Sequence, residues 1–74
     1  MKKTSYMMLT DVMVSKAQED LKESVTVLDD YNSEYKTYDT STLQGDIIKA
    51  IRMLDDIKSK ITEYGQKCAK EEQA

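Results

Sequence analysis

The sequence has no histidine, proline, tryptophan or phenylalanine, and it has only two glycines and one cysteine in 74 residues. The absence of histidine removes the common zinc-site spacings and the usual acid–base catalysts. A single cysteine, Cys68, cannot form an internal disulfide. The scarcity of proline and glycine excludes a loop-rich fold or a β-sandwich. What is present is charge, at 34% of the residues, which is typical of long helices exposed to solvent.

Charge and hydropathy predict a soluble protein that binds neither nucleic acid nor the core of a bilayer. The net charge of -3 opposes nonspecific binding to phosphates. No run approaches the ~20 apolar residues that a membrane-spanning helix needs. The N-terminus resembles a secretory signal, with Lys2 and Lys3 before an apolar run, but Asp11 interrupts that run. We therefore expect a cytoplasmic protein, or one exported without a cleaved signal peptide.

A heptad repeat in the first half of the chain predicts a long helix. Every seventh residue from Met7, together with the residue three positions after each, forms the predicted seam. The first set is Met7, Val14, Leu21, Leu28 and Tyr35, and the second is Thr10, Ala17, Ser24, Tyr31 and Tyr38. The predicted helix runs from about Ser5 to a residue between Leu28 and Tyr38. Residues 29–38 are open to either a helix or a loop.

The second half repeats the pattern and predicts a second helix. Its seam is Ile47, Leu54, Ile61 and Cys68, with Ala50, Ile57 and Tyr64 three residues after the first three and Ile51 alongside. Residues 39–45 hold the cluster of turn-forming residues and are predicted to be the turn. Ser41 and Gln44 have the spacing of a capping box, so the helix should begin near Thr42. Gly65 is expected to fray its last turns.

These helices predict an all-α fold, a single antiparallel two-helix hairpin over residues 1–74. Two helices bury only one face each, and isolated hairpins of this kind are marginal in water. We therefore expect the hairpin to complete a helical bundle or a coiled coil. It would do so by binding a protein partner or by self-association, with a dimer as the expected homo-oligomer.

Two clusters and one flanking residue are candidate partner-binding sites. Near the N-terminus the apolar residues surround most of the helix, while the neighbouring C-terminal segment is too polar to cover them. Three tyrosines near the turn share one helical face and are candidates for an aromatic anchor. The candidates are Met7, Met8, Val12, Met13, Tyr31, Tyr35, Tyr38 and Ile48. The alternatives are a frayed helix end for the first cluster and tyrosines packed over the turn for the second.

Enzymatic and metal chemistry find little support in the sequence. Asp30, Asn32 and Glu34 alternate like the start of a calcium loop, but Tyr35 stands where that loop needs glycine. Asp55 and Lys58 have the spacing of a solvated surface pair. We expect no catalytic residue, no metal site and no cofactor, so the protein is predicted not to be an enzyme.

The segment Leu43-Gln44-Gly45 stands at the predicted turn, where small type VII secretion proteins of the ESAT-like family carry a Trp-x-Gly motif. The chain resembles that family in outline, with leucine in place of the tryptophan. Membership would imply dimerisation, secretion as a folded hairpin, or escort of a larger protein to the export machinery.

Three non-enzymatic roles follow from these features. The first is a secretion-associated hairpin, or a small chaperone or targeting factor. The second is a phage-encoded inhibitor that binds and blocks a host defence protein. The third is a self-assembling structural coiled coil.

Overall fold

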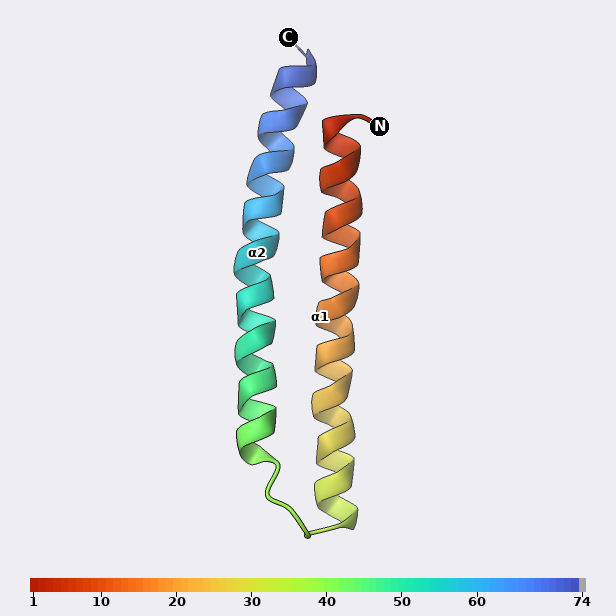
Figure 1. The fold of residues 1–74 in the computed structure, drawn as a ribbon, viewed down its shortest axis with the longest axis vertical. Helices are drawn as coiled ribbons and strands as arrows, with labels where there is room; N and C mark the ends of the chain where they lie inside the picture. The colour runs from red at the N-terminus through yellow and green to blue at the C-terminus, as the bar shows by residue number, and fades with distance from the viewer. Residues whose placement is uncertain (74) are drawn as a thin grey trace.

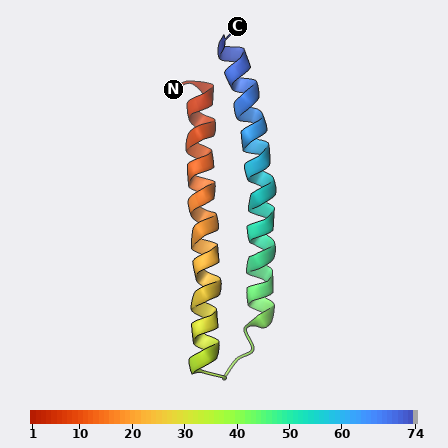
Figure 2. The same cartoon turned by 180° about the vertical axis from the view of Figure 1, so that it is seen from behind.

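The computed structural model describes residues 1–73 and shows two α-helices that lie side by side in opposite directions (Figure 1 and Figure 2). Helix α1 spans Lys3–Glu34 and helix α2 spans Ser41–Gln73, with no strand in the described part of the chain. Both termini lie at one end of the hairpin, and residues 35–40 connect the helices at the other. The predicted all-α hairpin is confirmed for these residues, and Ala74 lies outside them. Neither helix is long and apolar enough to cross a membrane.

The connection spans residues 35–40, so α1 ends within the predicted range of 28–38 and α2 begins one residue before the predicted Thr42. Helix α1 ends at Glu34, because Tyr35 adopts an extended conformation while its N–H still donates to the carbonyl oxygen of Tyr31 at 2.7 Å. Helix α2 begins at Ser41, so residues 42–45 form its first turn. The predicted turn at residues 39–45 is therefore wrong in extent, and Leu43-Gln44-Gly45 is helical.

The predicted capping box between Ser41 and Gln44 is also wrong. The N–H and the hydroxyl of Ser41 both donate to Oδ1 of Asp39, at 3.0 and 2.7 Å. The backbone bond and then the hydroxyl bond lower the pKa of the Asp39 carboxyl. Asp39 thereby satisfies a backbone donor that the first turn of a helix leaves without an intrahelical partner. The side chain of Gln44 instead reaches α1, where its Nε2 donates to the carbonyl oxygen of Val25 at 3.2 Å.

The less exposed side chains of each helix form a row, here called the internal seam, with alternating spacings of three and four residues. In α1 the seam is Thr4, Met7, Asp11, Val14, Gln18, Leu21, Val25, Leu28 and Asn32. In α2 it is Gln44, Ile47, Ile51, Leu54, Lys58, Ile61, Gly65 and Cys68. The predicted sevenfold sets from Met7 to Leu28 and from Ile47 to Cys68 are confirmed. The predicted companions three residues later are wrong in part, because the seam uses the residue four positions later. Ser24, Tyr31 and Ala50 are half-buried beside the seam, and Ile51, predicted alongside, belongs to it, whereas the other companions are exposed: Thr10, Ala17, Tyr38, Ile57 and Tyr64.

Gly65 lies in this seam and does not end the helix. Helix α2 continues to Gln73, so the predicted fraying at Gly65 is wrong. A Cβ at Gly65 would lie 3.8 Å from Cβ of Met7, an ordinary van der Waals distance. The glycine therefore lies against Met7 of α1 rather than in a loosened turn.

The hairpin is a thin rod. Its Cα extents are 60 × 17 × 11 Å and its radius of gyration is 17.3 Å, whereas a compact domain of this length has about 11 Å. Its accessible surface is 5940 Å². A compact monomer of 8.5 kDa exposes about 4,650 Å², so the rod exposes roughly 1,300 Å² more.

Candidate partner-binding surface

The internal seam holds polar side chains at several of its positions. Gln18 is 4% exposed, and its Nε2 donates to the carbonyl oxygen of Ile51 at 3.0 Å and to Oδ1 of Asp55 at 2.6 Å. Nζ of Lys58 donates to Oε1 of Gln18 at 3.4 Å. Gln18 therefore stands between Asp55 and Lys58, which were predicted to pair directly. Burial of the amide is tolerated because its nitrogen and its oxygen both have partners.

A second polar layer closes the seam beside the connection. Nε2 of Gln44 donates to Oδ1 of Asp29 at 2.7 Å, in addition to its bond with α1 backbone. The hydroxyl of Thr40 donates to Oδ1 of Asn32 at 2.8 Å, and Nδ2 of Asn32 approaches Oε1 of Gln44 at 3.3 Å. Thr40 is 8% exposed. These bonds fix where α2 starts relative to the end of α1.

Charged and hydroxyl groups join the helices at the other end. Nζ of Lys3 lies 2.9 Å from Oε2 of Glu71, and this contact raises the pKa of Lys3. The N–H of Thr4 donates to Glu72 at 3.1 Å and its hydroxyl does so at 2.8 Å, which together lower the pKa of Glu72. The three charged groups are exposed and Thr4 is half-buried, so each contact contributes little to stability but marks the register of the two helices.

The polar layers leave the seam with little buried apolar surface. Among residues 1–73 the one buried hydrophobic side chain is Ile61, at 8% exposure. Fourteen large apolar side chains are exposed in the same part of the chain. Single exposed apolar residues are ordinary on a protein surface, whereas a contiguous set marks an interaction site. Whether these fourteen side chains form an interaction site therefore depends on how they are arranged around the hairpin.

Helix geometry divides the exposed residues between the two broad faces of the hairpin. Each helical residue is rotated by about 100° from the one before it, and antiparallel helices turn in opposite senses when viewed from one end. Residues directly before a seam position therefore lie on the same face in both helices, and residues directly after one lie on the opposite face. The ion pair between Lys3 and Glu71, which precede Thr4 and Glu72, agrees with this rule.

The first of these faces carries half of the exposed apolar side chains. Seven of the fourteen precede a seam position, against three that follow one. The seven, here called the exposed apolar face, are Tyr6, Met13, Val27, Leu43, Met53, Ile57 and Tyr64. Their exposed fractions run from 40% at Ile57 to 65% at Met53. The set extends over nearly the whole length of both helices, so this face is the candidate partner-binding surface.

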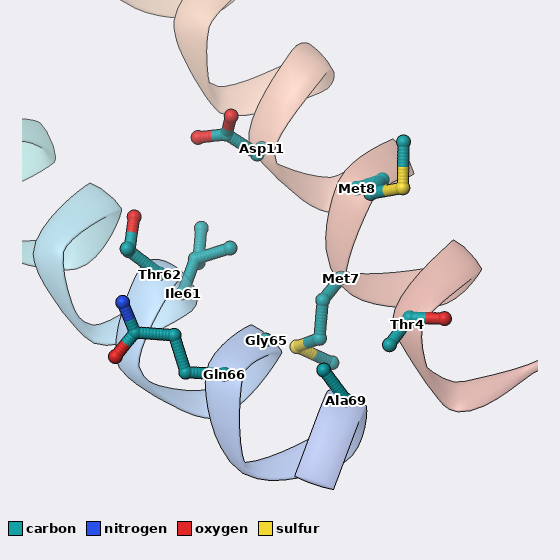
Figure 3. A pocket seen from close by; sticks show the side chains of 9 residues that line it. All are labelled: Thr4, Met7, Met8, Asp11, Ile61, Thr62, Gly65, Gln66 and Ala69. Carbon is teal, nitrogen blue, oxygen red and sulfur yellow. The ribbon is translucent and has the colours of Figure 1, made fainter. Parts of the chain in front are cut away.

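The opposite face carries an open groove near the chain termini, shown in Figure 3, with a volume of about 340 Å³. Met7 points between the helices towards Gly65 and Ala69, and Gly65 leaves the floor without a side chain. Asp11 is the one titratable residue of its lining. The groove is lined by Thr4, Met7, Met8, Asp11, Ile61, Thr62, Gly65, Gln66 and Ala69. A second hollow of about 380 Å³ lies at the connection and includes Tyr35, Tyr38 and Asp39.

The structure does not bring the predicted partner-binding residues together on one surface. Met8, Val12 and Ile48 each follow a seam position and lie on the opposite face, with exposures of 69%, 64% and 40%. Met13 belongs to the exposed apolar face, while Met7 is half-buried in the seam.

The three tyrosines are split between the end of α1 and the connection. Tyr31 is half-buried and precedes a seam position, and its ring centroid lies 5.7 Å from that of Tyr35. Tyr38 is 74% exposed in the connection. The pair formed by Tyr31 and Tyr35 packs locally, as the alternative of tyrosines over the turn predicted. Binding by any of these residues stays a prediction.

Sequence reasoning missed the binding candidates that the fold does group together. Ile57 and Tyr64 were predicted to face α1, and Tyr6 was not singled out. The signal in the sequence was the number of residues between one seam position and the next. A step of four residues places Gln18 and Lys58 in the seam, and it turns Ala17 and Ile57 outwards.

Comparison with known proteins gives no relative: no protein-family model, no curated protein and no solved structure matches the chain.

Proposed function

We propose that the chain is a non-enzymatic protein–protein interaction module that binds through its exposed apolar face. The observation that carries this proposal is the uneven placement of exposed apolar side chains, seven on that face against three on the opposite one. A surface of alternating apolar rows on two antiparallel helices fits a helical partner, because a partner helix fills the groove between them.

The surplus of accessible surface supports the same role. The rod exposes roughly 1,300 Å² more than a compact monomer of its mass, and a standard interface buries about 800 Å² on each partner. One partner on one broad face would therefore remove more than half of this surplus.

A non-enzymatic role is supported by the chemistry of the described side chains. The groove on the opposite face offers Asp11 without a second titratable group in its lining. The polar side chains of the seam are occupied by bonds that hold the two helices together, such as those of Gln18 and Gln44. Acid–base catalysis needs a pair of groups that is free to act on a substrate.

The test is recovery of partners from the native cell with three matched baits: the natural chain, Met53→Glu on the exposed apolar face and Met8→Glu on the opposite face. The two methionines are 65% and 69% exposed, so the substitutions are matched in kind and in environment. We expect the natural chain and Met8→Glu to recover the same protein, and Met53→Glu to lose it. Recovery of that protein by all three baits would contradict the proposal.

The identity of the recovered protein would separate the roles that the sequence leaves open. A component of an export machine, or an aggregation-prone protein, would favour a secretion-associated hairpin or a small chaperone. A host defence protein would favour an inhibitor. We propose the first role as the working hypothesis, because an apolar face on a small helical hairpin suits a protein that covers an apolar segment of its client.

A further inference from the structure

We propose that a second copy of this chain covers the exposed apolar face, and that α2 of one copy runs antiparallel to α2 of the other about a twofold axis at Met53. The proposal rests on the proposed function, since it uses the same face, and it names the occupant. The product is a four-helix bundle made of two hairpins.

The area of the face suits such a dimer. The broad side of the rod measures 60 by 17 Å between Cα atoms, or about 1,000 Å², which matches the 800 Å² per copy of a standard interface. A twofold interface must also be complementary to itself. A face made largely of apolar side chains meets that condition without an opposite charge on the partner.

The charges of α2 on this face suit the antiparallel orientation. Asp46 and Lys60 lie seven residues before and seven residues after Met53, and both directly precede a seam position. Reversal about Met53 therefore places Asp46 of one copy opposite Lys60 of the other. The symmetry makes this contact twice, so these two charges of each copy find an opposite charge at the rim of the interface. Asp20 of α1, which also precedes a seam position, lies near the axis and next to Asp20 of the second copy.

The sizes of the side chains follow the same symmetry. In α2, reversal about Met53 brings the small Ala50 within one residue of the position opposite Ile57 of the second copy, and Leu43 within one residue of the position opposite Tyr64. Small residues opposite large ones allow the layers of a bundle to interdigitate.

The other twofold arrangement, with the chain termini of both copies at the same end, fits less well. It places α1 of one copy over α2 of the other. Lys60 then falls opposite the stretch from Met13 to Ala17, and Asp46 opposite the stretch from Val27 to Tyr31. Neither charge meets an opposite charge directly, so the charges of α2 favour the antiparallel arrangement.

The oligomeric state of the purified chain tests whether a second copy covers the exposed apolar face. We expect sedimentation equilibrium to give a dimer for the natural chain and for Met8→Glu. Met53→Glu should raise the dissociation constant at least about a hundredfold, because it places two like charges at the twofold axis. A monomer at every concentration, or dissociation of Met8→Glu as readily as Met53→Glu, would overturn the proposal. If the natural chain were a monomer, the three baits could still recover a different partner protein. The failure of the dimer proposal would therefore be distinguishable from the failure of the proposed function.

A disulfide tests the arrangement of the two copies. In a Cys68→Ser background, Met53→Cys should form an intermolecular disulfide under an added mild oxidant, because the two thiols lie side by side at the axis. Met8→Cys in the same background should not. A dimer that resists cross-linking at position 53 would show that the helices are not paired in this way, and the proposal would be wrong.

Charge reversal gives a readout that a loss of folding cannot imitate. Lys60→Asp should weaken the dimer about tenfold, since it brings two acidic pairs together. Adding Asp46→Lys to the same chain should restore the original dissociation constant. Failure of the double variant to recover would contradict the contact between Asp46 and Lys60.

Discussion

The internal seam and the exposed apolar face are two strips of the same helices that differ in exposure more than in composition. The seam is mostly apolar but buries Gln18 and includes Asp11, Asn32 and Lys58, whereas the face a third of a turn away exposes seven large apolar side chains. The seam resembles a specificity element, in which hydrogen bonds fix the register of the helices. The face resembles half of a core.

The comparison separates the hydrogen bonds that set the alignment of the two helices from the apolar burial that stabilises them. The bonds of Gln18 and Gln44 select one alignment of α1 and α2, but exchange of these groups between water and protein contributes little net free energy. Burial of apolar surface supplies the larger favourable term in folding and in association. We infer that the second term is completed only when the exposed apolar face is covered.

The largest expected effect comes from a charge in the seam compared with a charge on the face. Leu54→Asp should cost roughly 3 kcal/mol and unfold the chain, because the carboxylate would enter the contact between the helices. Ile57→Asp, three residues away, should retain the helical signal at low temperature and lose association. Circular dichroism and sedimentation check the pair. Equal loss of helix in both variants would remove the distinction between the strips.

A smaller effect is expected when the polar layer of the seam is removed. Gln18→Ala should lower the free energy of unfolding by about 1–2 kcal/mol, because the hydrogen bonds and the packing of the side chain are both lost. Gln18→Leu should recover that loss and exceed the natural chain by up to about 1 kcal/mol, since Asp55 can return to solvent. Urea denaturation measures both. If leucine destabilises as much as alanine, the hydrogen bonds of Gln18 stabilise the seam more than we infer.

The two helical glycines test how closely the seam is packed. Gly65→Ala should raise the free energy of unfolding by about 0.5–1 kcal/mol, because the added Cβ meets Met7 at an ordinary distance and alanine favours helix. Gly45→Ala has nothing within 4 Å of the new Cβ and provides the control for helix propensity alone. A lower thermal midpoint for Gly65→Ala, with a raised one for Gly45→Ala, would show that α1 and α2 approach more closely at Gly65.

The smallest effect is expected at the cap of α2, which lies outside both strips. Ser41 lowers the pKa of Asp39 in the folded chain, so the unfolded chain takes up this proton first as the pH falls. The stabilisation is complete above the ordinary pKa of an aspartate and is lost as the pH falls through the lowered folded-state value. Asp39→Asn should therefore reduce the fall of the thermal midpoint in acid. An unchanged pH profile would show that the cap does not contribute.

The sequence predicted the helices well because their apolar heptads are long and regular. The positions from Met7 to Leu28 and from Ile47 to Cys68 were correct, and so was the antiparallel arrangement. The end of the first helix was placed only between Leu28 and Tyr38, since residues 29–38 lack a decisive breaker. The turn was predicted too late because Gly45, a common turn residue, is helical here.

The exposed apolar face was not predicted because apolarity alone was used to choose the second heptad position. Ala17 was preferred to Gln18, and Ile57 to Lys58. Gln18 can be buried only because the carbonyl of Ile51 and the carboxylate of Asp55 stand opposite it, and those partners come from the other helix. A pattern within one helix does not contain that information. This choice shifted the predicted row by one residue. Residues that were predicted to lie between the helices, such as Ile57, therefore lie on the exposed apolar face.

The dependence of thermal unfolding on protein concentration tests the central claim most directly. If the hairpin is completed by a second copy, dilution favours the unfolded chain, and the unfolding midpoint should rise steadily over about a hundredfold increase in concentration. Met53→Glu should remove the dependence and unfold at the lower midpoint of the free hairpin. A natural chain that unfolds at one high temperature at every concentration would contradict the claim, because the hairpin would then be stable with its apolar face uncovered.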